Sequence, residues 1–215
     1  MKKLFFLLLA IANSVACPAQ LTIKDVLTSM PTEVAPYLND KQKSELGKFL
    51  NSTDTVTVNN IVGGTTVVDS VSNTFVRIRL SKSSDIQIKL LPLNDTTRIV
   101  CVVKTVTKPV PDSSISFYST EWNKLNDNFN LPDKNDPKTM LALLTARPDT
   151  MNADRYAELQ DMIEPVITSV AFKGKENSLT YSLGLPMLNK AERDEIKAII
   201  KQKSFNWNGK IFNKD

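Results

Sequence analysis

The most constraining feature of this 215-residue chain is an alternation of apolar and polar residues in its middle third. In the clearest stretch, Val76–Leu80, two arginines alternate with three apolar residues. Successive side chains of a β-strand point to opposite faces, so this spacing places the apolar side chains on one face and the arginines on the other. Residues 55–118 are therefore predicted to form strands with at least one buried face.

The turns between these strands predict antiparallel neighbours. Ile86–Leu90 repeats the alternation, and Asn94-Asp95 then turns the chain into the apolar run Ile99–Val106. An earlier pair, Gly63-Gly64, separates two more strand-like stretches. Glycine, asparagine and aspartate favour the tight turns that join antiparallel strands, so we expect a hairpin at both places.

Helix-start signals occur on both sides of this strand-rich region. A typical start has a capping residue followed three residues later by a polar residue that reaches back to it. Such pairs are Thr22 with Asp25, Asn39 with Gln42, and Asn189 with Glu192, while Asp136 precedes Pro137. We therefore expect the α+β class: a mostly antiparallel sheet with helices from both ends packed on one face, and a second small sheet near the C-terminus.

The first 19 residues have the order of a secretory signal peptide. Two lysines follow Met1, an apolar run covers Leu4–Ala12, and small residues lead up to Ala19. This order predicts a signal peptide over residues 1–19 and a single α+β domain over residues 20–215. The alternative is two subdomains divided near residues 122–150, a stretch rich in Asn, Asp and Pro. The protein is expected to be exported to the periplasm or the cell surface.

Cys17 offers a second interpretation of the leader, in which it carries the lipid of a bacterial lipoprotein. Ser14 stands where such leaders have leucine, so we favour cleavage after Ala19. Cys101 is then the only cysteine, which excludes an intramolecular disulfide. No later apolar run approaches the roughly 20 residues of a spanning helix, so no transmembrane segment is expected.

The absence of histidine removes most of the common site chemistries. It excludes Ser-His and Cys-His catalytic pairs and histidine-bound metals. Because the mature chain has one cysteine, a monomer cannot hold a metal cluster bound by several thiolates. The sequence also has no glycine-rich phosphate-binding motif. We expect no cofactor and no metal. Removal of Lys2 and Lys3 lowers the formal charge from +4 to +2, which gives no indication of a nucleic-acid partner.

Three groups of residues remain as candidates. Asp112 and Glu121 flank an aromatic segment and are candidates for a carboxylate pair. The candidates for a basic sheet face that binds an acidic glycan or lipid head group are Arg77, Arg79, Lys89, Arg98 and Lys104. The candidates for stacking on sugar rings are Phe117, Tyr118, Trp122 and Trp207. Solvated faces and core packing explain the same residues, and Cys101 is expected to fill the core.

These observations favour an exported binding or accessory protein of the periplasm or envelope, with an envelope protein or a glycan as partner. The alternative is a histidine-free hydrolase that uses two carboxylates. Two buried carboxylates about 5 to 10 Å apart in a cleft would indicate the hydrolase. No catalytic residue is assigned.

Several short packing and strand motifs bear on the relatives of this chain. They are Met30-Pro31, Tyr37-Leu38, Lys89-Leu90-Leu91-Pro92, the run Arg98–Val103, and the run Asp112–Tyr118 with Trp122. In these motifs the chain resembles an uncharacterised family of exported proteins from Bacteroidales. Because the motifs concern packing, the resemblance identifies relatives and implies no reaction.

The resemblance and the signal peptide together imply O-glycosylation. Exported proteins of this bacterial group carry it on Ser or Thr that follows Asp and precedes a small or aliphatic residue. The candidate sites are Thr55, Ser70, Thr96 and Thr150. The alternative interpretation is that Asp-Thr and Asp-Ser pairs simply begin turns.

Overall fold

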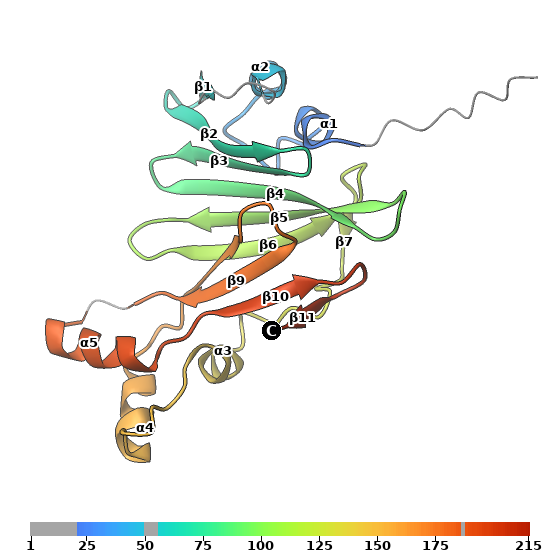
Figure 1. Ribbon diagram of the computed structural model, residues 1–215. Coiled ribbons are helices and arrows are strands. Elements are labelled where there is room, and N and C mark those ends of the chain that lie inside the picture. The colour runs from blue at the N-terminus through green and yellow to red at the C-terminus, as the bar shows by residue number, and fades with distance from the viewer. Residues whose placement is uncertain (1–20, 50–55, 186–187) are drawn as a thin grey trace, which may run out of the picture.

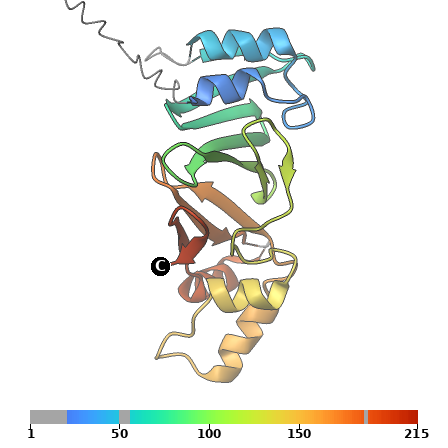
Figure 2. The same cartoon turned by 90° about the vertical axis from the view of Figure 1, so that its right-hand side faces the viewer.

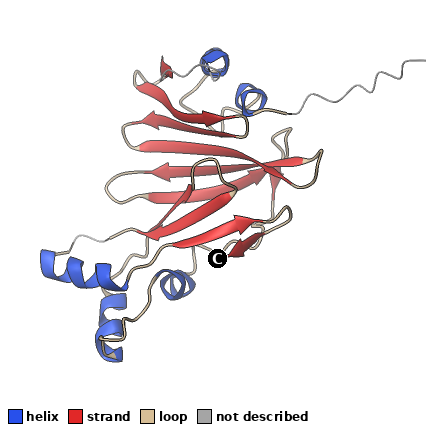
Figure 3. Cartoon of the chain, in the orientation of Figure 1, coloured by secondary structure: helices blue, strands red, loops and turns tan. Residues whose placement is uncertain are grey.

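The computed structural model describes residues 21–49, 56–185 and 188–215, which form two sheets and five helices (Figures 1 and 3). The helices are α1 (Ile23–Thr28), α2 (Asp40–Phe49), α3 (Pro137–Leu144), α4 (Ala153–Asp161) and α5 (Lys190–Ile199). The expected caps are confirmed. The side chains of Thr22 and Asp25 each accept a hydrogen bond from the other residue's peptide N–H. Local capping signals therefore set where these helices begin.

The larger sheet is an antiparallel meander whose seven strands follow one another in chain order. The strands are β1 (Val56–Asn59), β2 (Thr65–Ser72), β3 (Phe75–Ser81), β4 (Ser84–Pro92), β5 (Arg98–Val106), β6 (Asp112–Tyr118) and β7 (Lys124–Leu125). Both expected hairpins are confirmed. β1 pairs with β2 across Gly63-Gly64, and β4 pairs with β5 along its whole length.

The second sheet has the strand order β11-β10-β9-β8. Its strands are β8 (Thr168–Phe172), β9 (Ser178–Leu183), β10 (Lys203–Trp207) and β11 (Phe212–Lys214). The small sheet expected near the C-terminus is thus confirmed. The two-residue strand β7 and the three-residue strand β11 were not predicted. Strands of two or three residues are too short to show a pattern of alternating apolar and polar residues.

Helices α1 and α2 cover one face of the larger sheet. Val26 and Leu27 of α1 belong to a buried core with Ile78, Ile88 and Val100 from the central strands. All five side chains are fully enclosed, so this face is closed to water. Burying each aliphatic side chain of this kind contributes about 1.5 to 3 kcal/mol to the free energy of unfolding.

The second sheet covers the opposite face, and helices α3, α4 and α5 contribute to the same core. Cys101 and Phe117 lie in this core with Leu144 of α3 and Ile196 of α5. The α+β class with a mostly antiparallel sheet is confirmed, but the expected packing of helices from both ends on one face is wrong. Figure 2 shows the two groups of helices at opposite ends of the molecule. The run Ile99–Val103 is apolar at every position, so β5 needs cover on both faces.

Candidate functional site

β6 of the larger sheet lies beside β8, an edge strand of the second sheet, and we call this junction the seam. The Ser113 hydroxyl on β6 accepts a hydrogen bond from the peptide N–H of Val170 on β8 at 2.9 Å. Farther along β8, the peptide N–H of Phe172 donates to Gln87 Oε1 of β4 at 2.9 Å. Side chains of the larger sheet thus pair with the outer edge of β8, as edge strands in proteins commonly require.

Lys134 stands between two cavities of the seam. Their volumes are about 560 and about 490 Å³, and both are lined by Lys134 and Asn135. Pockets of this size hold small ligands or single side chains of a partner. Lys134 Nζ lies 2.8 Å from Asp112 Oδ1 and 2.8 Å from the carbonyl oxygen of Ser113. One lysine therefore fastens the connection after β7 to the start of β6 and contributes to both walls.

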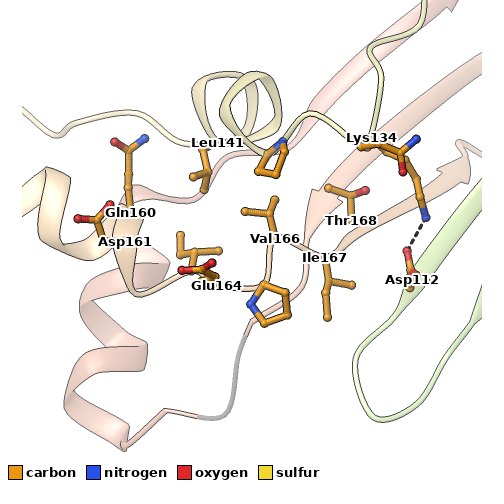
Figure 4. Close-up of a pocket in the computed structure, with 13 residues that line it drawn as sticks. Asp112, Lys134, Leu141, Gln160, Asp161, Glu164, Val166, Ile167 and Thr168 are labelled. Carbon is orange, nitrogen blue, oxygen red and sulfur yellow. Dashed lines mark hydrogen bonds and ion pairs between the residues drawn. The ribbon is translucent and has the colours of Figure 1, made fainter.

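The first cavity combines apolar walls with carboxylates (Figure 4). Its apolar lining includes Leu141, Ile163, Val166 and Ile167. Asp161 and Glu164 are exposed and line the same cavity, whereas Asp112 is held by Lys134 at 2.8 Å. The cavity therefore presents an apolar middle with acidic groups at its rim.

The second cavity is rich in neutral polar groups. Its lining includes Ser114, Asn126, Asn128 and Asn135. The buried rings of Phe117 and Tyr181 line its inner side. Burial raises the pKa of Tyr181, and the nearby Cys101 adds a smaller effect in the same direction. The phenol therefore stays protonated at neutral pH and can act as a hydrogen-bond donor.

The structure does not bring the predicted carboxylate pair together. Asp112 begins β6 and Glu121 lies beyond its end at Tyr118. Six steps along an extended strand span about 20 Å, too far for the two carboxylates to act on one bond. Hydrogen bonds from Thr120 and Ser119 hold the pKa of the exposed Glu121 below its ordinary value. These two candidate residues therefore do not form a carboxylate pair.

Two of the basic candidates, Arg77 and Arg79 of β3, form ion pairs. Asp85 is the one buried carboxylate among the described residues, and its Oδ2 lies 3.1 Å from Arg77 Nη2. Arg79 pairs with Asp69 at 2.8 Å. The described residues thus contain no pair of buried carboxylates, and both arginines of β3 have an acidic partner.

The five basic candidates do not form a single surface. Its members were Arg77, Arg79, Lys89, Arg98 and Lys104. Cys101 is the cross-strand neighbour of Lys89, and Arg98 and Lys104 each lie three residues from Cys101. Side chains of a strand alternate, so the last two residues point to the face opposite Lys89. Lys104 Nζ indeed reaches the carbonyl oxygen of Glu33, on the side of α1 and α2.

Three of the four candidate aromatics pack in the interior, as the core-packing interpretation expects. Phe117, Trp122 and Trp207 are buried. The indole N–H of Trp122 donates to Ser29 Oγ at 3.2 Å, and that of Trp207 donates to a carbonyl oxygen of β4 at 2.6 Å. Tyr118 is half-buried, with its ring centroid 5.3 Å from that of Trp122. Because a stacking platform needs an exposed ring face, this role is wrong for the three buried rings.

Cys101 is buried, as predicted. It lies on β5 in the core between the two sheets. Burial raises the pKa of its thiol well above the ordinary value, so the thiol stays protonated. A protonated, enclosed thiol packs as a small apolar side chain.

Three of the four candidate O-glycosylation sites are exposed: Ser70, Thr96 and Thr150. Thr96 lies in the turn between β4 and β5, and Thr150 in the turn before α4. Ser70 lies within β2, beside a register shift. Thr55, the signal peptide and Cys17 lie outside the described residues.

The residues that line the first cavity carry no sequence motif. Sequence reasoning singled out Asp112 but missed Lys134, Asp161, Glu164 and Thr168, which come from separate segments. In the described part of the chain, no three or more Asp, Glu or Cys side chains are grouped so that they could hold a metal ion. No helix there is both long and apolar enough to cross a membrane.

Comparison with known proteins identifies a family and a similar solved structure. A family model described as "Protein of unknown function (DUF3256)" matches residues 15–212. None of the curated proteins matches this chain. The solved structure of a domain of an uncharacterized protein from Porphyromonas gingivalis W83 matches with a TM-score of 0.74 and 22% identity. The match covers 90% of this chain and 98% of that chain, and at this identity it shows a common fold alone.

Proposed function

Because this chain belongs to the DUF3256 family, whose function is unknown, we propose a role from its site: an exported binding or accessory protein of the periplasm or envelope. Its partner is an envelope protein or a glycan, held at the seam. The family match agrees with the resemblance found in the sequence, and the Porphyromonas structure links that resemblance to Bacteroidales.

The observation that carries this proposal is the pair of adjoining cavities that share Lys134 and Asn135. The cavities combine apolar walls, amides and ionisable rims, which is the usual composition of a binding site. A reaction that uses two carboxylates needs one of them in an apolar setting that raises its pKa. The described residues contain a single buried carboxylate, Asp85, and Arg77 holds it away from these cavities.

The test has two parts. Fractionation of the native host, with the intact mass of the protein, determines export and the mature N-terminus; we expect Gln20 without lipid. The ¹⁵N-labelled mature protein is then titrated with peptides and oligosaccharides prepared from the envelope. Lys134→Ala is expected to weaken binding about tenfold or more, because Lys134 fastens the connection after β7 to the start of β6 and so shapes both walls.

Lys138→Ala is the matched control, because Lys138 is an exposed lysine of α3 that lines neither cavity. It should bind as the wild type does. A protein that stays in the cytoplasm, or equal loss of binding in both variants, would refute the proposal.

The hydrolase alternative rests on the carboxylates that line the first cavity, Asp161 and Glu164. It predicts that a bound oligosaccharide or peptide is cleaved and that Asp161→Asn abolishes cleavage. Mass spectrometry of the ligand after incubation separates the two roles. Intact ligand in complex with the protein supports the binding role.

A further inference from the structure

Thr168 presents an unused hydroxyl to the first cavity (Figure 4). The residue is 2% exposed, and its side chain forms no hydrogen bond with any described residue. Every fully enclosed side-chain nitrogen or oxygen of the described residues has a partner. The Thr168 hydroxyl is therefore open to the cavity, where a buried polar group needs a ligand or water.

The peptide groups of Thr168 point away from β9, toward the outer edge of β8. The peptide N–H of Gly184 donates to the carbonyl oxygen of Ile167 at 2.8 Å, which fixes the alternation along β8. Thr168, Val170 and Phe172 then direct their peptide groups away from β9. The peptide N–H groups of Val170 and Phe172 donate to side chains of the larger sheet. Thr168 instead lies beside the first cavity.

Among the outward peptide groups of β8, those of Thr168 form no hydrogen bond with a described residue, and we take this position as the one where an added strand could pair. An extended peptide binds an exposed sheet edge through main-chain hydrogen bonds, while neighbouring pockets select its side chains. A single open position permits one residue of such a peptide to pair with Thr168. The adjoining cavity, of about 560 Å³, has room for the side chain of that residue and its neighbours.

The charge of the cavity selects the side chain. Asp161 and Glu164 line it and form no ion pair with any described residue, whereas Lys134 is held by Asp112. Leu141 and other apolar residues lie between the two charged ends (Figure 4). A lysine or arginine fits this lining, since its stem is apolar and its end is cationic.

We propose that the first cavity binds an extended segment of an envelope protein through a Lys or Arg side chain. The segment's main chain bonds to Thr168, the aliphatic stem packs on Leu141 and Val166, and the cationic end lies near Asp161 and Glu164. This inference rests on the proposed binding role and names its partner as a basic peptide. A neutral glycan would leave both carboxylates without a partner of opposite charge.

The test uses the mature protein and two capped tripeptides, Ala-Lys-Ala and its norleucine analogue, which has no charge. Binding is measured by ¹⁵N chemical shifts. We expect the lysine peptide to bind at least about tenfold more tightly than the analogue. The double variant Asp161→Asn with Glu164→Gln should lose that preference. Thr168→Val, which keeps the side-chain shape, should weaken binding about threefold to tenfold.

The matched control is Asp154→Asn with Glu158→Gln, which removes two exposed carboxylates of α4 that do not line the cavity. It should keep the preference for lysine. Equal binding of both peptides, or no binding of either, would overturn the inference. Binding of an envelope glycan that the lysine peptide fails to displace would also overturn the inference. The proposed binding role would still stand in that case.

Discussion

Lys89 Nζ of β4 donates a hydrogen bond to the carbonyl oxygen of Lys175, which lies 86 residues later, at 2.5 Å. Lys89 is 1% exposed. Its other neighbours are neutral: Thr74 Oγ1 at 3.4 Å and the Phe75 ring centroid at 5.8 Å. No carboxylate of the described residues pairs with it. A buried ammonium group bonded to neutral partners thus holds the turn between β8 and β9 against the larger sheet.

We predict that Lys89 makes the free energy of unfolding rise with pH. Burial lowers the pKa of Lys89 from its ordinary 10.5 to about 8. Between these values the unfolded chain binds more protons than the folded chain, so the free energy of unfolding rises with pH. Lys89→Met should remove about 1 to 3 kcal/mol of this rise. Urea unfolding of the wild type and the variant at about pH 7 and about pH 10.5 measures the rise in each protein.

Lys175→Met is the matched control, because Lys175 contributes only its backbone carbonyl to this contact and its side chain is exposed. It should retain the rise. Lys104, whose pKa is also lowered by burial, is present in all three proteins, so its effect cancels. The same rise in Lys89→Met as in the wild type would contradict the prediction.

Ser113 fastens the two sheets at the seam, and its loss should destabilise the protein. Its hydroxyl accepts from Val170 N–H at 2.9 Å and shares a 2.8 Å hydrogen bond with Thr105. Ser113→Ala leaves the buried Val170 N–H without a partner, which costs about 1 to 3 kcal/mol. Ser114→Ala, one residue on and exposed, should stay within about 0.5 kcal/mol of the wild type. Urea unfolding measures the free energy of unfolding of both variants. A similar decrease in both would show that Ser113 does not fasten the two sheets.

Much of the fold was predictable because its signals are local. The pair Asn39 and Gln42 exchanges capping hydrogen bonds at 2.9 Å, as its spacing indicated. The alternation in Ile86–Leu90 identified β4, but it also suggested a solvated face for Gln87 and Lys89. Both are buried, because the second sheet covers that face. Which surface covers a strand depends on contacts between distant segments, and these leave no pattern in a single sequence.

The candidate site was less predictable than the fold, for the same reason. Asp112 begins a strand, Lys134 lies in an irregular connection, and Asp161 ends a helix. Their common cavity exists only because β8 lies against β6. Thr168 has no unusual neighbours in sequence, and its hydroxyl became a candidate only once the hydrogen bonds along β8 were known.

Cys101 should be unreactive in the folded protein, since its thiol is enclosed and burial raises its pKa. Labelling by a thiol reagent should proceed only at the rate at which the protein unfolds. Cys101→Ser should lower the free energy of unfolding by about 1 to 3 kcal/mol, because it buries an added hydroxyl. Rapid labelling under native conditions would show that the core opens at this point.

The last prediction is O-glycosylation of the native protein. Ser70, Thr96 and Thr150 are exposed, as a bulky polar modification requires, and each follows an aspartate. The side chains differ in their freedom: Thr96 Oγ1 bonds to Asn94 Oδ1 at 3.1 Å within its turn, and Asp69, beside Ser70, pairs with Arg79.

The Thr150 side chain forms no hydrogen bond with a described residue. We therefore expect its glycan occupancy to be at least as high as that of Thr96. Mass spectrometry of protein from the native host, against the same chain made in a host without this pathway, measures the occupancy at each site. Variants Thr96→Ala and Thr150→Ala should each remove one glycan mass and leave the free energy of unfolding within about 0.5 kcal/mol of the unmodified protein. If peptides that cover Thr55, Ser70, Thr96 and Thr150 all have their unmodified masses, the Asp-Ser and Asp-Thr pairs serve only to shape turns and strand irregularities.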